Sequence, residues 1–189
     1  MIPAKVISLP MASERQAWIK NNLPFIFSFF WAIDGKKFTL SHPTINSQAV
    51  ATFLTHVSVI NYVKDEPEEI FLILEDDSEF TGTSESIEEI ISTLPNDWDM
   101  AFLGWYKSDF LEKPQIINDD WVKVSRFWGM HAYLVRKKSI TKIYRSIHNI
   151  DNHIDIQLSS VFSRGSLNGY FIKNPIFKQS GKFPSQINI

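Results

Sequence analysis

The sequence predicts a single α/β domain, residues 1–189, in which a mainly parallel central sheet carries helices on both faces. Segments with strand character alternate with segments of helical periodicity, a pattern typical of a doubly wound sheet. Residues 70–74 are five consecutive apolar residues, as expected for a strand buried on both faces. With 189 residues and 44% hydrophobic content, the chain is long enough to bury one full core.

The first half of the chain is predicted to run strand, helix, strand, helix, strand, at residues 5–9, 13–22, 25–32, 45–63 and 70–74. The first two strands are apolar runs that end at turn signals, Pro10 and Asp34-Gly35. The helix at 45–63 is the longest, because apolar residues recur there at helical spacing and Pro67 follows its end.

The second half is predicted to contain helices at residues 84–94, 137–147 and 152–162 and short strands at 100–103, 132–135 and 170–172. The helix at 84–94 gathers isoleucine and leucine on one stripe and stops at Pro95. Residues 105–124 contain Pro114 and a cluster of Asn and Asp, so we expect an irregular substrate-binding loop there.

Composition excludes several classes of protein. A formal net charge of -2 argues against a general nucleic-acid binder, which would carry a basic field. The absence of cysteine excludes a disulfide framework, a zinc-thiolate site and a thiol nucleophile. No apolar run reaches membrane-spanning length and the first residues lack a secretion signal, so a cytoplasmic location is expected.

The buried strand at 70–74 is followed at once by four carboxylates, Glu75, Asp76, Asp77 and Glu79. Each close pair of like charges costs about 1 kcal/mol in water and several times more in a half-buried cleft. In open α/β sheets, ligands bind outside the carboxyl ends of the strands. A hard divalent cation that carries a phosphate ligand is therefore the predicted occupant.

The chain lacks other common phosphate-binding and nucleophile motifs. It has no Gly-rich dinucleotide loop, phosphate-loop lysine, Gly-x-Ser-x-Gly elbow or His-Glu-x-x-His. Its seven glycines make cradling of phosphates by the backbone a poor prospect. Phosphate charge would have to be met by a metal and by Arg or Lys side chains.

The order and spacing of several motifs resemble those of glycosyltransferase family 25, the lipopolysaccharide-biosynthesis and collagen-galactosyltransferase type, over nearly the whole chain. The matching blocks include Val6-Ile7-Ser8-Leu9 with Glu14-Arg15, Ala32-Ile33-Asp34-Gly35, Leu54-Thr55-His56, Leu72-Ile73-Leu74-Glu75-Asp76-Asp77, Asp97-Trp98-Asp99, Gly129-Met130-His131 and Ile154-Asp155-Ile156. The resemblance implies a GT-A-like fold, a UDP-sugar donor, Mn2+ or Mg2+ at the acidic motif, and inverting transfer of a sugar, usually galactose, to a glycan or glycolipid acceptor.

Under this resemblance the acidic motif holds both metal and donor. Strand alternation points Glu75 and Asp77 to one side and Asp76 to the other. Asp77 is the expected direct metal ligand, with Asp76 as a second candidate, and Asp76 or Glu75 is expected on ribose or sugar hydroxyls. The alternative is an acidic turn that binds nothing.

An inverting transfer also needs a base that takes the proton of the acceptor hydroxyl. Asp155 is one candidate, as base or as a more distant acceptor ligand. His131 is the other, as base or third metal ligand, against a purely structural role. Asp151 shares a helix face with Asp155 but stands where an N-cap belongs, so we expect it to cap.

Two further residues are expected at the donor. Arg15 could meet the uracil edge or the diphosphate, and its alternative is a solvated helix charge. Asp34 could bond uracil or ribose, and its alternative is a plain Asx turn. His56 matches the family motif, although packing or a buried hydrogen bond explains it equally well.

Aromatic and basic residues outside the acidic motif suggest three other contacts. Trp105, Tyr106 and Trp121 could stack on sugar faces. Lys178 could screen the diphosphate when the C-terminal segment closes, against a solvated role. Phe171, Phe177 and Phe183 alternate with lysines, a mixture that suits peripheral contact with an anionic membrane or ordinary packing.

Two other functions stay open from the sequence. A non-catalytic nucleotide-sugar or carbohydrate-binding relative would keep the fold and lose the base. A metal-dependent phosphatase also places acids at a strand end, but it would ordinarily need a second Asp two positions after the nucleophile. Asp77-Ser78-Glu79 fits that pattern poorly.

Overall fold

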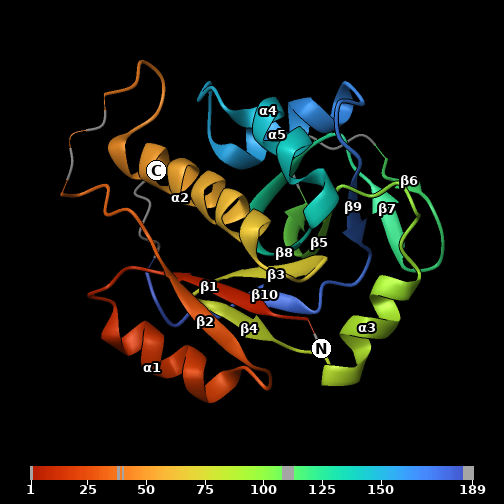
Figure 1. The fold of residues 1–189 in the computed structure, drawn as a ribbon, viewed down its shortest axis with the longest axis horizontal. Helices are drawn as coiled ribbons and strands as arrows, with labels where there is room; N and C mark the ends of the chain where they lie inside the picture. Colours follow the sequence, from red (N-terminus) through yellow and green to blue (C-terminus); the bar gives the residue numbers. More distant parts are fainter. Residues whose placement is uncertain (1, 38, 40, 108–112, 185–189) are drawn as a thin grey trace.

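A computed structural model describes residues 2–184 except 38, 40 and 108–112. In this part of the chain, the central sheet has eight strands in the spatial order β2-β1-β3-β8-β5-β9-β7-β6 (Figure 1). Their bounds are β1 Ala4–Ser8, β2 Phe27–Trp31, β3 Ile70–Glu75, β5 Met100–Lys107, β6 Gln115–Ile116, β7 Trp121–Lys123, β8 Phe127–Arg136 and β9 Gly169–Ile172.

The strand directions confirm the predicted mainly parallel sheet. β1 pairs in parallel with β2 and β3, and β5 pairs in parallel with β9. β8 lies antiparallel between β3 and β5, so these five strands all run one way. Only β8 and β7 among the described strands oppose that direction, and they make the sheet mixed.

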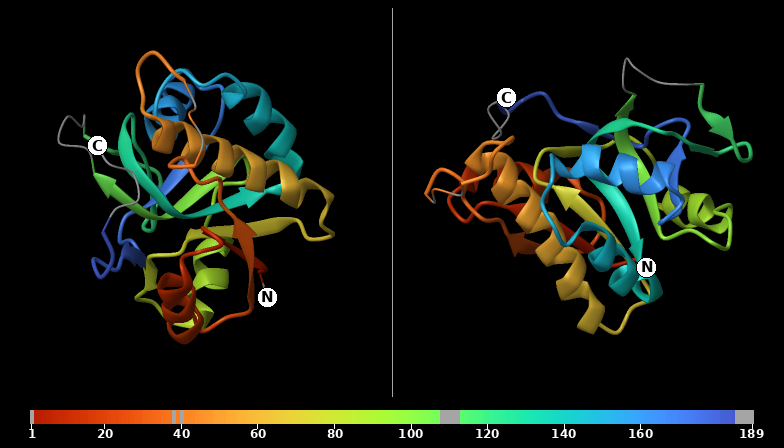
Figure 2. Two further views of the ribbon diagram at one scale, coloured as in Figure 1. Left: turned by 90° about the vertical axis from the view of Figure 1, so that its left-hand side faces the viewer. Right: turned by 90° about the horizontal axis from the view of Figure 1, so that it is seen from above.

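Helices cover both faces of the sheet, also as predicted. α1 (Ser13–Asn22) and α3 (Ser84–Ser92) lie on one face, together with the small antiparallel pair of β4 (Ser78–Phe80) and β10 (Phe177–Gln179). α2 (Ser47–Tyr62), α4 (Ile140–Ile147) and α5 (Ile154–Ser163) lie on the other face, and Figure 2 shows the same two layers from the side. None of the described helices is both long and apolar enough to cross a bilayer.

β3 is buried on both faces, as its composition predicts. Phe71, Leu72, Ile73 and Leu74 are each exposed by 1% or less. Burying an apolar side chain of this size stabilises the fold by about 1.5–3 kcal/mol, so the strand is fixed firmly between β1 and β8. This placement delivers Glu75 and the following acids to the carboxyl edge of the sheet.

The prediction of an irregular loop at 105–124 was wrong in part. β5 continues to Lys107, and β6 and β7 follow, while residues 108–112 fall outside the described part. Trp105 and Trp121 are both buried. Each indole N–H donates a hydrogen bond inside the protein, so burial leaves neither group unsatisfied. Only Tyr106 of the three predicted stacking rings is exposed, by 43%.

Two predictions about the C-terminal third also need correction. Asp151 does not cap α5, because the helix begins at Ile154 and His153 occupies the N-cap position. Phe171 and Phe177 are 0% and 1% exposed, since they lie on β9 and β10 and pack in the core. Those two rings cannot contact a membrane, and the prediction missed β10 altogether.

Candidate functional site

A cavity of about 420 Å³ opens at the carboxyl ends of β1, β2 and β3, beneath α2. Its walls come from the end of β1, the first turn of α1, the turn after β2, one face of α2, and the acidic turn with the C-terminal segment. The lining residues include Ser8, Leu9, Arg15, Ile33, Asp34, Gly35, Gln48, Thr52, Thr55, His56, Glu75, Asp76, Asp77, Gln179, Gly181 and Phe183. The acids thus lie where the sequence predicts a ligand site.

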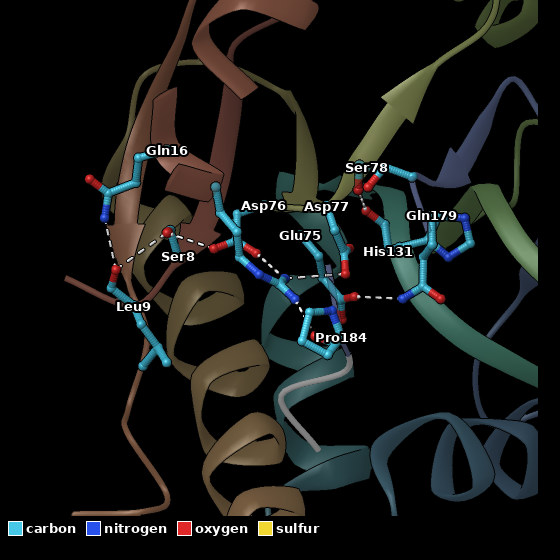
Figure 3. Close-up of polar contacts among 12 residues, drawn as sticks. Ser8, Leu9, Gln16, Glu75, Asp76, Asp77, Ser78, His131, Gln179 and Pro184 are labelled. Atoms are coloured by element: carbon cyan, nitrogen blue, oxygen red, sulfur yellow. Dashed lines mark hydrogen bonds and ion pairs between the residues drawn. The ribbon is translucent and has the colours of Figure 1, made fainter. Parts of the chain in front are cut away.

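Asp76 points to the β1 side of the cavity and has partners on both carboxylate oxygens (Figure 3). Its Oδ2 accepts a hydrogen bond from Ser8 Oγ at 2.7 Å, and its Oδ1 accepts one from Arg15 Nη1 at 2.7 Å. Ser8 follows Ile7, which pairs with Glu75, so the parallel register itself brings Ser8 to Asp76. Burial raises the pKa of Asp76, and the bonds from Ser8 and Arg15 oppose that rise.

Asp77 is the least satisfied acid of the motif. Arg15 Nη1 donates to its Oδ2 at 3.2 Å, but its Oδ1 is buried and has no hydrogen-bond partner among the described residues. Burial raises the pKa of Asp77 to about 7, and the neighbouring charge of Glu75 adds to the rise, while Arg15 opposes it. A buried carboxylate oxygen without a partner is costly, so this atom is suited to an added ligand.

Glu75 is held by the buried side chains of His56 and Tyr133 on one side and by the exposed Gln179 on the other. His56 Nε2 lies 3.3 Å from Glu75 Oε1, and His56 Nδ1 lies 2.9 Å from the hydroxyl of Tyr133 on β8. Gln179 Nε2 donates to Glu75 Oε2 at 3.4 Å. Burial acts to raise the pKa of Glu75, but the bond and charge of His56, the charge of His131 and the bond from Gln179 together leave the pKa below its ordinary value.

Arg15 supplies much of the compensating charge that the sequence requires. α1 begins directly after β1, so its first turn brings Arg15 to the carboxyl edge of the sheet, where the side chain is 8% exposed. Besides the two acids, its Nη2 donates to the carbonyl of Pro184 at 2.6 Å. The alternative of a solvated helix charge is therefore wrong.

The carboxylate oxygens of the acidic turn fit a divalent cation that is bound by one carboxylate and by the phosphates of a bound substrate. Among the described residues, no three His, Asp or Glu side chains converge to enclose a metal by themselves. Asp77 Oδ1 is free and Glu75 lies beside it, whereas Asp76 has both oxygens engaged. Mg2+ commonly takes one or two carboxylates and completes its shell with water and substrate phosphates, which this arrangement allows.

His131 and Asp155 lie outside the set that lines the cavity. The His131 ring is buried, with Nε2 3.3 Å from the Phe177 carbonyl and Nδ1 without a partner. Burial lowers the pKa of His131, against the charge of Glu75, so the ring is neutral near pH 7. One carboxylate oxygen of Asp155 accepts a hydrogen bond from Gly129 N–H at 3.0 Å, and the other accepts one from Ile156 N–H.

Asp34 and Lys178 are placed differently from each other. Asp34 lines the cavity, and its Oδ1 also accepts the Lys36 N–H at 3.0 Å, so the Asx turn that was its alternative is present. Lys178 lies 3.4 Å from Glu79 and is not among the lining residues. Its ammonium group therefore pairs with Glu79 and not with the acids that line the cavity.

Sequence reasoning missed the residues that support the acids. Ser8, Tyr133 and Gln179 each bond an acid or its partner, and they come from β1, β8 and β10. Ser8 belongs to the Val6-Ile7-Ser8-Leu9 block. Parallel pairing of the first and third predicted strands would have placed it beside Asp76. Tyr133 and Gln179 depend on antiparallel neighbours that no local pattern reveals.

Gly35 fixes the turn between β2 and α2 that forms one wall of the cavity. A Cβ there would lie 2.6 Å from Gln48 Cα and 2.7 Å from the Ser47 carbonyl oxygen. We expect Gly35→Ala to lower the free energy of unfolding by about 1–3 kcal/mol, because backbone atoms must move to admit the methyl group. Urea denaturation measures this, with the exposed neighbour Lys36→Ala as control; equal stability of both variants would contradict the close packing.

Comparison with known proteins identifies the fold. No protein-family model and no curated protein sequence matches the chain. Its structure is similar to that of a glycosyltransferase involved in glycosylation of the major capsid of PBCV-1, with a TM-score of 0.57 and 14% identity over 98% of this chain and 94% of that one.

Two further solved structures match the chain with lower scores. The inositol-1-phosphate CTP transferase from T. maritima gives a TM-score of 0.47 at 13% identity, over 98% of this chain and 72% of that one. A Drosophila β-1,4-galactosyltransferase 7 variant, in complex with manganese, UDP-Gal and xylobiose, gives 0.46 at 11% identity, over 94% and 69%. Membership of family 25 stays a prediction. The chain has a GT-A-like α/β fold, as in the PBCV-1 capsid glycosyltransferase.

Proposed function

We propose that this protein is a glycosyltransferase that moves a sugar from a UDP-sugar donor to a glycan or glycolipid acceptor with Mn2+ or Mg2+ bound at Asp77. The observation that carries the proposal is the unpartnered, buried Oδ1 of Asp77 beside a cavity at the carboxyl edge of a GT-A-like sheet. The motif resemblance to family 25 adds the inverting outcome and galactose as the expected sugar.

The cavity offers separate places for the parts of the donor. We assign the nucleoside to the side formed by Ile33, Asp34 and α2, where apolar and polar atoms mix. The diphosphate then lies toward Asp77 and Arg15. Glu75, held ionised by His56, is assigned to hydroxyls of the ribose or the transferred sugar.

Departure of the nucleoside diphosphate develops negative charge on its phosphate oxygens. A divalent cation supplies Lewis-acid stabilisation of that charge when it is bound. Asp77 would hold the cation through Oδ1, with Glu75 as the nearest second carboxylate. Asp76 serves the site in a different way, because its bonds to Ser8 and Arg15 fix the turn that presents Asp77.

The acceptor hydroxyl must lose a proton during transfer. We retain His131 and Asp155 as candidates for the base. His131 is chemically suited to the role, because the Nδ1 of its neutral ring has no partner among the described residues and can accept a proton. This nitrogen lies near Gly129, and the ring lies against the exposed Tyr106. Asp155 contributes through its bond to Gly129 N–H, which orients the start of β8 next to His131.

A binding protein without turnover is the second candidate, because both base candidates lie outside the lining of the cavity. We expect purified protein to release UDP from UDP-galactose with Mn2+, and to lose this activity in EDTA. Nucleotide that raises the melting temperature without turnover of any UDP-sugar, with or without glycan acceptors, would favour the binding protein. Hydrolysis of simple phosphate esters alone would indicate a phosphatase.

A further inference from the structure

Residues 180–184, which we call the strap, follow β10 and form part of the cavity wall through Gly181 and Phe183, next to the acidic turn. In the view of Figure 3, Pro184 lies just below Glu75 and Asp77. At one end of the strap, Ser180 N–H donates to the backbone carbonyl of Asp77 at 2.8 Å. At the other end, the Pro184 carbonyl accepts from Arg15 Nη2 at 2.6 Å, so both ends are tied to the acidic motif or its partner.

The middle of the strap rests on α1 through aromatic contacts. The Phe183 ring lies 5.8 Å from the Trp18 ring and 5.1 Å from the Arg15 guanidinium. Lys182 Nζ lies 5.6 Å from the centre of the Trp18 ring, and its side chain is otherwise exposed. Because Phe183 also lines the cavity, the position of the strap decides the shape of that wall.

Arg15 joins the strap and the acids through a single guanidinium. Its Nη1 bonds Asp76 and Asp77, and its Nη2 bonds Pro184. A divalent cation on Asp77 would place two positive charges within a few ångströms of that guanidinium, in a site with little solvent. The bond from Arg15 to Asp77 Oδ2 is the longest of the three, at 3.2 Å, and it lies on the same carboxylate that would hold the cation through Oδ1.

We propose that Arg15 is the resident counter-ion of the acidic motif, that it holds the strap shut over the cavity, and that cation binding at Asp77 loosens the strap. This inference rests on the proposed function for Asp77 as the cation ligand. Movement of the strap would withdraw Phe183 from the cavity wall and free Nη2 of Arg15 for a donor phosphate. A ligand can shift such an equilibrium only if it favours the open form, and repulsion of Arg15 supplies that preference.

Trypsin reports the state of the strap, because cleavage after Lys182 requires local opening of the chain. Loss of residues 183–189 from the full-length protein is followed by intact mass spectrometry, with and without Mn2+. Calorimetry fixes in parallel the Mn2+ concentration that saturates the protein. We expect saturation to speed this cleavage about tenfold, in proportion to the increased open fraction.

Three variants make the test specific. Asp77→Asn should show no Mn2+-dependent change in cleavage, which also controls for effects of Mn2+ on trypsin. Trp18→Leu removes the ring under Phe183 and Lys182 but leaves the cleavage sequence intact, so it should cleave rapidly without Mn2+. Tyr144→Ala removes an exposed ring on α4 and should behave as the unaltered protein.

The outcomes separate the two proposals. Mn2+ that binds by calorimetry but leaves the cleavage rate unchanged would overturn the strap inference and leave the metal assignment standing. Absence of Mn2+ binding, with and without UDP, would overturn both. A folded Trp18→Leu protein that resists cleavage as well as the parent would show that the strap is not held through α1, and would also overturn the inference.

Discussion

Asparagine at position 77 is expected to abolish sugar transfer while making the folded protein more stable at pH 8. The neutral amide cannot bind a divalent cation as a carboxylate does, so kcat/KM for UDP release should fall by about 10²–10³. The same change removes a charge that the fold tolerates poorly. Two measurements on Asp77→Asn, UDP release and urea denaturation, therefore distinguish a functional role of this carboxylate from a structural one.

The sign of the stability effect follows from the pKa of Asp77. Its pKa rises from 3.8 to about 7 on folding, so between these values the native protein holds a proton that the unfolded chain has released. The contribution of Asp77 to the stability of the parent protein should consequently fall as pH rises from about 4 to about 7. Asp77→Asn lacks this loss, and at pH 8 we expect it to be more stable by about 1–3 kcal/mol.

Glu79→Gln is the matched control for this experiment. Glu79 lies two residues further along, is partly exposed and pairs with the exposed Lys178 at 3.4 Å. Exposed ion pairs contribute about 0–1 kcal/mol, so neither activity nor pH-dependent stability should change much. If Asp77→Asn were less stable than the parent at pH 8, Asp77 would be a structural anion and the metal assignment would be wrong.

Replacement of Arg15 by methionine is expected to have the largest effect on stability. The guanidinium is buried and bonds two acids and a backbone carbonyl, so its removal leaves Asp76 buried without a cation. Removal of one partner from a buried ion pair typically costs about 3–5 kcal/mol. Urea denaturation at pH 8 measures the loss, which should shrink at lower pH because protonation neutralises the acids.

Two companion variants show whether the loss comes from charge. Arg15→Lys keeps the charge but cannot bond three acceptors in a fork, so its loss should be intermediate. In Arg15→Met with Asp76→Asn, the buried anion is also removed, and part of the stability should return. An Arg15→Met protein within 1 kcal/mol of the parent would contradict the view of Arg15 as counter-ion.

The sequence was informative where local patterns carry the structure. The five-residue apolar run at 70–74 has no polar atoms to satisfy on either face, so its burial as a central strand was fixed by composition. The acids that follow it had to lie at the edge of the sheet, because the strand ends there. The alternation of strands and helices along the chain likewise sufficed to predict a sheet with helices on both faces.

Local patterns failed where a second segment decides the outcome. Trp105 and Trp121 looked like surface rings, but β9 and α3 supply partners for their indole N–H groups and bury them. β10 is short, and within the described part of the chain it pairs only with β4, so its existence depends on a contact distant in sequence. Such contacts leave no periodicity in the chain.

The sequence by itself determined that a row of carboxylates follows a buried strand and that something positive must balance them. Only the tertiary structure decided what balances each one: Ser8 and Arg15 for Asp76, His56 and Gln179 for Glu75, and for Asp77 a longer bond from Arg15 that leaves Oδ1 without a partner among the described residues. The reason is physical. Charge is local to a residue, whereas its compensation depends on segments that folding brings together from α1, α2 and the C-terminal end.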